Sequence, residues 1–135
     1  MYQVMVVDDE PMAASLIVNI IKRKYSNFDI MGTAYDGEEA LELMEKKGEL
    51  DVLITDIQMP VMNGLKLVEE TKKRYPEVLS VIVSGYQEFE YAKQAIAFGV
   101  CDYILKPIVP SEFAKLITKI EEKPRQKARP HRQKC

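Results

Sequence analysis

The sequence predicts an α/β fold in which a five-stranded parallel sheet is doubly wound, with helices on both of its faces. Strand-like apolar runs alternate with helix-like segments along the chain, and the connections between them are short. This alternation favours βαβ units with right-handed crossovers. The strand-like runs are apolar at nearly every position, which is typical of strands covered on both faces.

The first predicted strand and helix occupy residues 2–24. Residues 2–7 are nearly all apolar, and Pro11 suits the first turn of a helix that ends near Lys24. Apolar side chains recur along this helix at the spacing of helical turns: Met12, Leu16, Ile17, Ile20 and Ile21.

Residues 30–34 form a second, weaker strand, and Asp36-Gly37 marks the start of a second helix, whose end is followed by Gly48. The apolar stripe of this helix contains Ala40, Leu41 and Met44. Residues 52–55 form the third strand, which is the most clearly buried of all.

Residues 57–64 form a loop, and the helix over residues 65–75 is stopped by Pro76. The loop contains typical turn residues: Pro60, Asn63 and Gly64. Residues 79–83 form the fourth strand.

Residues 88–98 are expected to form a helix that ends at Gly99, and residues 102–105 form the fifth strand. Ser111 is expected to cap a last helix, which extends to about Glu122. The apolar residues of that helix follow helical spacing: Phe113, Leu116, Ile117 and Ile120.

The charge is divided unevenly between the body and the end of the chain. Residues 123–135 contain six of the 19 basic residues and no acid, which leaves 13 bases against 21 acids and a charge of −8 for residues 1–122. We expect one domain over residues 1–122 and a disordered basic tail or linker over 123–135, interrupted by Pro124 and Pro130. Such a tail fits nucleic acid or acidic lipid less well than it fits a solvated linker.

No apolar run reaches the ~18 residues that a membrane span needs, and no export signal opens the chain, so a cytoplasmic location is expected. The two cysteines are too few for a disulfide framework and lack metal-ligand spacing. We expect Cys101 to be a small buried residue and Cys135 to be exposed.

Polar side chains stand where four of the predicted strands end. These residues are Asp8, Asp9, Asp56, Ser84 and Lys106. Ligands of doubly wound sheets bind beyond the carboxyl ends of the strands, so these side chains are expected to converge there. Each residue taken alone also has a plainer interpretation, since acids suit a helix N-terminus, a serine suits a turn, and a lysine suits the surface.

Three converging carboxylates would repel one another by about 4 kcal/mol per close pair at an effective dielectric constant near 20. A bound Mg²⁺ or Mn²⁺ together with the Lys106 ammonium would relieve this repulsion. Asp9, Asp56 and the backbone carbonyl of Gln58 are the expected protein ligands.

An aspartate in such a pocket can attack a phosphoryl group and form an acyl phosphate. The phosphoryl oxygens would then contact the cation, Lys106, and the hydroxyl of Ser84 with nearby backbone N–H groups. Catalysis in this arrangement consists of positioning and electrostatics.

The chain resembles a receiver domain of a two-component response regulator over about residues 2–122. Four segments carry the likeness: Val6-Val7-Asp8-Asp9-Glu10, residues 55–64 from Thr55-Asp56 to Asn63-Gly64, Val83-Ser84-Gly85, and residues 99–107 with Tyr103 and Lys106-Pro107. The resemblance implies a CheY-like, flavodoxin-like (βα)5 fold with strand order 2-1-3-4-5. Residues 84–92 further resemble receivers that are attached to AraC-type DNA-binding domains.

The resemblance implies that Asp56 accepts phosphate from a sensor histidine kinase in a Mg²⁺-dependent reaction. Asp8 and Asp9 would be the acid pair, with Asp8 acting on the cation through water. Ser84 and Lys106 would contact the phosphate, and Lys106-Pro107 would be a cis peptide. The domain would be a signalling phosphoacceptor rather than an enzyme, promoting only its own phosphotransfer and autodephosphorylation.

The resemblance also implies a switch and a tunable phosphate lifetime. Ser84 would move towards the phosphate, and Tyr103 would turn inward into the space released, changing the surface of the last two helices and the last strand. A phosphorylation-dependent homodimer is one possible readout. Gln58 and Tyr86 occupy positions that tune phosphate lifetime in such domains.

Three alternatives remain open from the sequence. A phosphatase of the haloacid dehalogenase type needs a second acid two residues after the nucleophile, where this chain has Gln58, and a nucleotide-binding domain needs a GxGxxG turn or a P-loop, which the chain lacks. A phosphate-independent interaction module is the third alternative. DNA binding would require an output domain that these residues do not contain, and the AraC-like segment favours the N-terminal part of a transcription regulator over a stand-alone receiver.

Overall fold

The computed structural model describes residues 1–85, 99 and 102–123. Its elements are β1 (Tyr2–Val7), α1 (Pro11–Lys24), β2 (Phe28–Ala34), α2 (Gly37–Lys47), β3 (Val52–Asp56), α3 (Gly64–Arg74), β4 (Leu79–Ser84), β5 (Asp102–Leu105) and α5 (Pro110–Glu122). The expectations for Tyr86, Cys101, Cys135, the helix over 88–98 and the tail beyond Lys123 lie outside the described residues. Within the described part, no helix has the length and apolar character needed to cross a membrane.

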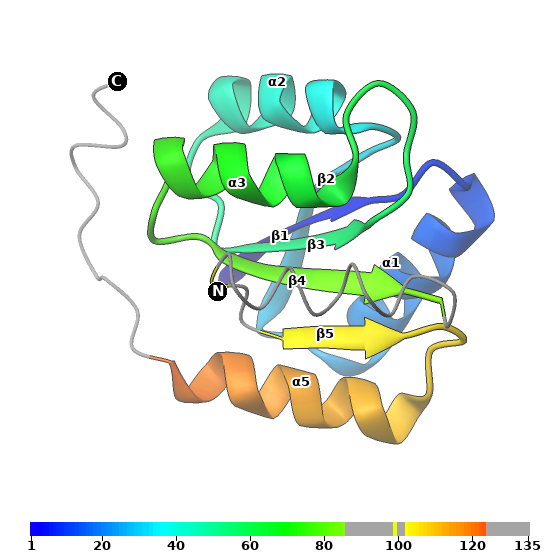
Figure 1. The fold of residues 1–135 in the computed structure, drawn as a ribbon. Coiled ribbons are helices and arrows are strands. Elements are labelled where there is room, and N and C mark those ends of the chain that lie inside the picture. The colour runs from blue at the N-terminus through cyan, green and yellow to red at the C-terminus, as the bar shows by residue number, and fades with distance from the viewer. Residues whose placement is uncertain (86–98, 100–101, 124–135) are drawn as a thin grey trace.

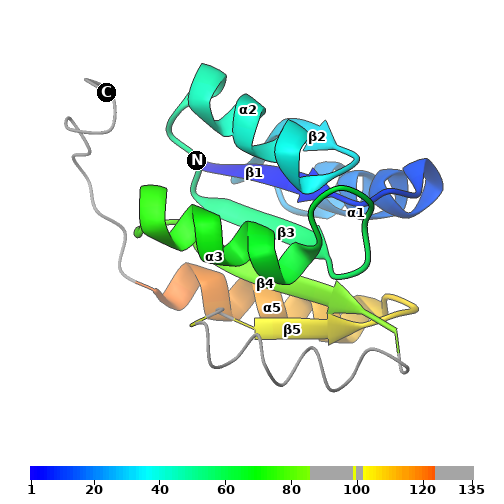
Figure 2. The ribbon, with the colours of Figure 1, turned by 45° about the horizontal axis from the view of Figure 1, so that its top comes forward.

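The strands form one parallel sheet in the order β2-β1-β3-β4-β5, as expected. This order can be followed from top to bottom in Figure 2. The strands point the same way, so their carboxyl ends share one edge of the sheet (Figure 1). The register places Val7 beside Ala34 and Thr55, and Ser84 beside Leu105. The sheet therefore brings its strand-end side chains to a single edge.

Three strands are longer than predicted. β2 begins at Phe28 rather than at Ile30, because the Phe28 ring is buried and stacks on Tyr2 with the ring centroids 4.6 Å apart. β3 and β4 extend by one residue to include Asp56 and Ser84, which pair with Val83 and Leu105. The two polar residues are thus fixed by the ladder and do not lie in flexible loops.

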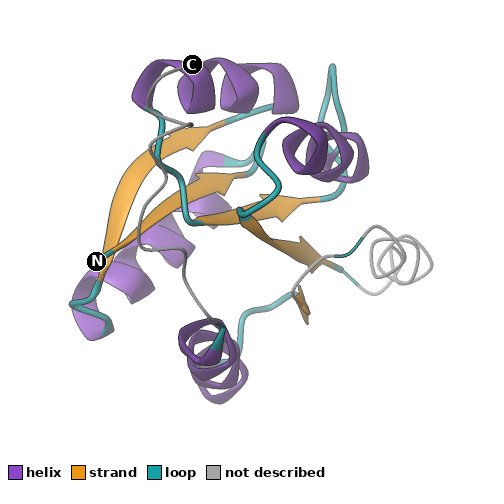
Figure 3. Cartoon of the chain, turned by 90° about the vertical axis from the view of Figure 1, so that its left-hand side faces the viewer, coloured by secondary structure: helices purple, strands orange, loops and turns teal. Residues whose placement is uncertain are grey.

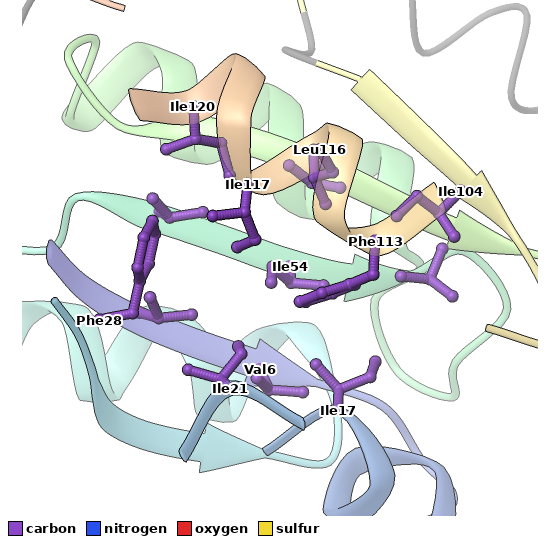
Figure 4. Packing of buried hydrophobic residues seen from close by; sticks show 14 of the residues in the cluster. Val6, Ile17, Ile21, Phe28, Ile54, Ile104, Phe113, Leu116, Ile117 and Ile120 are labelled. Carbon is purple, nitrogen blue, oxygen red and sulfur yellow. The ribbon is translucent and has the colours of Figure 1, made fainter. Parts of the chain in front are cut away.

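Helices cover both faces of the sheet (Figure 3). Alternating strand residues point to opposite faces, so each face has its own core. One core fills the space between the sheet and the helices α1 and α5, and it contains residues of the strands and of both helices. Figure 4 labels several of them: Val6, Ile54, Ile104, Ile17, Ile21, Phe113, Leu116, Ile117 and Ile120. Beneath α2 and α3 lie Met5, Val7, Leu53, Ala40, Leu41, Met44 and Leu67. This arrangement confirms the doubly wound fold.

Helix α1 has the predicted bounds, but its apolar residues do not all face the sheet. Ala14, Ile17 and Ile21 are buried, whereas Met12 is 86% exposed and Leu16 is 50% exposed. The helix rests on the sheet through the residues that follow the line 14, 17 and 21. Met12 and Leu16 therefore face outward near the functional edge.

The ends of α2 agree with the sequence, and the start of α5 does not. The Asp36 carboxylate accepts a hydrogen bond from the Glu39 backbone N–H at 2.9 Å, which caps α2. In α5 the predicted cap, Ser111, lies inside the first turn, because the helix begins at Pro110 with Val109 in extended backbone before it. A proline is favoured at the first helical position because its fixed φ is already helical, so the helix cap is Val109 and the helix starts two residues earlier than predicted.

The loop between β3 and α3 closes tightly on the strand that carries Asp56. The Gly64 N–H donates to the carbonyl oxygen of Ile57 at 2.7 Å. A Cβ atom at position 64 would collide with the backbone carbonyl oxygen of Asp56. Only glycine allows α3 to begin this close to the end of β3.

We expect Gly64→Ala to lower the free energy of unfolding by about 1–3 kcal/mol, because the added methyl group must push the Asp56 backbone aside. Urea unfolding followed by circular dichroism measures this. The matched control is Gly32→Ala, whose new methyl group would meet Leu43 Cδ1 at an ordinary 3.7 Å and should change stability by less than about 1 kcal/mol. Equal stability of the two variants would contradict the close approach.

Candidate functional site

The carboxyl edge of the sheet brings an amine between two carboxylates. Asp8 follows β1, Asp56 ends β3, and Lys106 follows β5. The Lys106 ammonium lies 3.3 Å from Asp8 Oδ2 and 3.3 Å from Asp56 Oδ2. Both carboxylates are buried, and the lysine side chain is only 28% exposed. Residues separated by 50 and 98 positions in sequence therefore meet as predicted.

Both oxygens of Asp8 have donors. Its Oδ1 accepts from the Glu10 backbone N–H at 3.0 Å, and its Oδ2 accepts from Lys106. The Asp8 N–H donates to the Ala34 carbonyl at 3.1 Å, which extends the ladder between β1 and β2 past Val7. Asp56 Oδ1 accepts from the Ile57 N–H at 2.8 Å. The two buried carboxylates are therefore held in fixed orientations.

Asp9 completes an acidic group at this edge. One carboxylate oxygen from each of Asp8, Asp9 and Asp56 lies within 4.8 Å of the others, and Asp9 is exposed to solvent. Among the described residues, Lys106 is the one cation paired with these acids, so three negative charges meet one positive charge. The excess of two negative charges and the all-oxygen donor set suit a hard divalent cation such as Mg²⁺.

The pKa values of Asp56 and Lys106 are both raised, for different reasons. Burial, followed by the negative charge of Asp8, raises the pKa of Asp56 to about 6, against the opposing effect of Lys106. Burial lowers the pKa of Lys106, but the carboxylates of Asp56 and Asp8 outweigh burial and raise that pKa above its usual value. At neutral pH the site therefore holds an ionised Asp56 that gains from any additional positive charge.

Ser84 brings a hydroxyl group to the same edge. Its side chain is fully buried, and its Oγ has no hydrogen-bond partner among the residues that the structure describes. Its carbonyl accepts a 2.7 Å hydrogen bond from the Lys106 N–H. A buried hydroxyl without a partner loses the solvation that it has in water, so it gains when an acceptor such as a phosphoryl oxygen arrives.

Tyr103 lies on β5 and is half-buried. It packs against a small cluster formed by Ile57, Leu65, Val68 and Ile82. Ile57 directly follows Asp56, so this cluster connects the tyrosine to the strand that carries the acid. The Lys106-Pro107 peptide is cis, as the resemblance implies. Gln58 is exposed in the loop after Asp56, and its roles as carbonyl ligand and lifetime residue stay predictions.

The model of the response regulator receiver domain family matches residues 4–118. The chain belongs to this family. Receiver domains bind Mg²⁺ at an acidic pocket, interact with histidine kinases, and generally serve in signalling rather than as enzymes. The acidic group of Asp8, Asp9 and Asp56 corresponds to such a pocket.

Two relatives of this receiver are named as transcriptional regulatory proteins. It is 35% identical over 122 residues to the transcriptional regulatory protein YesN of Bacillus subtilis, covering 90% of this chain and 32% of YesN. It is 37% identical over 108 residues to the transcriptional regulatory protein HptR of Staphylococcus aureus, covering 80% of this chain and 42% of HptR. The receiver thus spans less than half the length of these relatives.

A similar solved structure is the receiver domain of AraT, a response regulator from Geobacillus stearothermophilus. The two are 36% identical with a TM-score of 0.83, and the match covers 90% of this receiver and 93% of the AraT domain. The fold and the family are therefore both established by likeness over most of the chain.

The sequence does not indicate the apolar cavity that adjoins the site. This cavity of about 450 Å³ is lined in part by Ala13, Leu16, Ile17, Lys106, Pro107 and Ile108. The sequence predicts that these residues lie in a helix and in a loop. No sequence pattern shows that the helix and the loop leave a cavity between them. The apolar residues of α1 are the available signal, and only the structure gives their orientation.

We expect Asp56→Asn to stabilise the receiver at neutral pH. The pKa of Asp56 rises from 3.8 to about 6 on folding, so the folded state binds this proton more tightly than the unfolded state. The stabilisation of the folded state by this tighter proton binding is present at low pH and is lost as the pH rises from about 4 to about 6. Replacing the carboxyl group should therefore raise the free energy of unfolding by about 1–3 kcal/mol at pH 7 and change little near pH 4.

Urea unfolding in EDTA across this pH range measures the effect. Asp29→Asn, at an exposed position on β2, is the matched control and should show no such pH-dependent gain. A gain at position 56 that is the same at pH 4 and pH 7 would contradict the assignment of the titration to Asp56.

Proposed function

We propose that Asp56 is the phosphoacceptor of this receiver and takes a phosphoryl group from a sensor histidine kinase in a Mg²⁺-dependent reaction. The observation that carries this proposal is the Lys106 ammonium between the buried carboxylates of Asp56 and Asp8, at 3.3 Å from each. An amine in this place can contact a phosphoryl oxygen while it stays next to Asp56, the proposed nucleophile. Asp9 and Ser84 supply the remaining polar groups.

Transfer begins with the attack of an Asp56 carboxylate oxygen on phosphorus. The bond from phosphorus to the kinase histidine nitrogen breaks, and its electron pair stays on the imidazole. The Lys106 ammonium contacts one phosphoryl oxygen, and the Ser84 hydroxyl donates to another. Oδ1 of Asp56 is fixed by the Ile57 N–H at 2.8 Å, so Oδ2 is the oxygen that faces Lys106 and forms the new bond.

Asp9, Asp56 and the backbone carbonyl of Gln58 would hold the divalent cation, with Asp8 acting through water. Both oxygens of Asp8 already accept hydrogen bonds, which supports the indirect role. A bound Mg²⁺ supplies the positive charge that the phosphoryl oxygens and the acids require. The Mg²⁺ contribution is electrostatic, and the covalent step belongs to Asp56.

Phosphorylation would be transmitted through Ser84 and Tyr103. The unpaired Ser84 hydroxyl moves to the phosphoryl group, and Tyr103 turns into the space that this movement opens. Tyr103 rests on the cluster of Ile57, Leu65, Val68 and Ile82, so its rotation changes the surface around β5 and α5. A coupling free energy of about 1–3 kcal/mol would shift the two conformations roughly 5–150-fold. A homodimer is the proposed readout.

The domain would extend over residues 1–122, with 123–135 as a basic tail or linker. YesN and HptR are transcriptional regulatory proteins that are longer than this chain. Their similarity supports a receiver at the N-terminal part of a transcription regulator, with an AraC-type output domain as the expected partner for DNA.

Acetyl phosphate with Mg²⁺ should add one phosphate to this chain, detected by intact mass spectrometry. Asp56→Asn should abolish the gain because the nucleophile is lost, and Lys106→Met should slow it by about 10²–10³ because one phosphoryl contact is removed. Lys22→Met, in the last turn of α1, is the matched control and should react like the wild type. Labelling of Asp56→Asn at the wild-type rate would refute the phosphoacceptor assignment.

The switch is tested by separating phosphorylation from its readout. We expect Tyr103→Ala to accept phosphate at a rate within about threefold of the wild type. It should lose most of the phosphate-induced dimer, because the coupling between phosphorylation and the dimer surface is proposed to act through the tyrosine ring. Sedimentation with and without acetyl phosphate measures dimerisation. Tyr75→Ala, at the end of α3, is a control for the loss of a half-buried tyrosine elsewhere. Normal dimerisation of phosphorylated Tyr103→Ala would exclude the aromatic step.

A further inference from the structure

An apolar cavity lies between α1 and the segment that follows β5. Its volume of about 450 Å³ falls within the range of small-molecule pockets. Helix α1 contributes Ala13, Leu16 and Ile17, and the segment after β5 contributes Pro107 and Ile108. These side chains offer no hydrogen-bonding groups, so the cavity favours an apolar occupant.

Lys106 joins this cavity to the charged site. It lines the cavity, and its ammonium lies 3.3 Å from Asp56 Oδ2. An occupant that reaches both compartments therefore meets the Lys106 ammonium at one end and the apolar side chains beside α1 at the other. A molecule that is apolar throughout would leave the lysine end unused.

The cavity is open to solvent at α1. Leu16 is 50% exposed, and Ala13 and Ile108 are partly exposed. A ligand can therefore enter from outside without unfolding the core, while Ile17 closes the inner wall. The size, the apolar wall and the single cationic end together suit a short chain that carries a phosphoryl group.

We propose that this cavity is an acyl subsite and that the receiver accepts phosphate directly from acyl phosphates with an apolar chain longer than acetyl. This inference rests on the proposed phosphoacceptor role of Asp56. The phosphoryl group lies against Asp56 and Lys106, and the acyl chain lies between Leu16 and Ile108.

The reaction needs no further reactant. An Asp56 oxygen attacks phosphorus, and the bond between phosphorus and the anhydride oxygen of the donor breaks. The electron pair of that bond leaves with the carboxylate, so the products are aspartyl phosphate and a free carboxylate. Burial of the acyl chain contributes binding energy in addition to the phosphoryl contacts.

The test compares three donors on the purified chain with Mg²⁺: acetyl phosphate, butyryl phosphate and phosphoramidate. Acetate and butyrate are leaving groups of nearly equal basicity, so a difference between these donors reports binding of the chain. Each buried methylene group contributes about fourfold, and we expect butyryl phosphate to exceed acetyl phosphate by about tenfold in kcat/KM of labelling. Phosphoramidate has no acyl chain, so its labelling rate reports phosphorylation of Asp56 without any contribution from the cavity.

Two substitutions by leucine on the same helix locate the effect. Ala13→Leu fills the cavity and should reduce the ratio of butyryl to acetyl phosphate to about one, whereas Ser15→Leu, at an exposed position that does not line the cavity, should keep the wild-type ratio. Circular dichroism checks that both variants are folded. The wild-type ratio alone tests the proposal if either variant does not fold.

Labelling by acetyl phosphate and phosphoramidate without a preference for butyryl phosphate would overturn the acyl subsite and leave the phosphoacceptor role intact. A preference that survives Ala13→Leu would overturn the location in this cavity. Failure of all three donors to label Asp56 would overturn both the phosphoacceptor role and the subsite.

Discussion

The ion pair of Lys106 with Asp8 and Asp56 is the constraint on which the site depends. It links the ends of β1, β3 and β5, which are far apart in sequence; β3 is the central strand, and β1 and β5 lie on opposite sides of it. Breaking it by removal of the lysine would leave two buried carboxylates without their cation, which is costly in a water-poor environment. The nitrogen atom that pairs with these carboxylates is also the one proposed to hold a phosphoryl oxygen.

The site holds more negative charge than the fold requires. Three carboxylates face one ammonium, and burial together with the negative charge of Asp8 raises the pKa of Asp56. Two apolar cores, one on each face of the sheet, stabilise the strands whose ends carry this charge. Functional sites often depart from the arrangement that is best for stability, and the departure here is confined to one edge.

The order of elements is predictable because parallel strands covered on both faces have an apolar sequence that few other structures share. The site residues are predictable because Asp56, Ser84 and Lys106 directly end or follow such strands. The rotation of α1 about its axis is not predictable from the sequence. Met12 and Leu16 have the spacing of buried residues, and only packing against the sheet decides which row of side chains faces inward. The sequence identifies Gly64 only as a turn residue. Its close approach to the Asp56 carbonyl is not predictable, because it depends on how α3 approaches β3.

The apolar cavity affects the charged site whether or not a ligand occupies it. Lys106 belongs to both, and Pro107 and Ile108 line the cavity beside it. Apolar neighbours lower the effective dielectric constant near the ammonium, which would strengthen its attraction to a phosphoryl oxygen. The apolar side chains of the same wall cannot orient a water molecule by hydrogen bonding for attack on the proposed aspartyl phosphate. Under the proposed phosphorylation of Asp56, the neighbouring residues of α1 would influence both the formation and the persistence of the phosphorylated state without touching the phosphate.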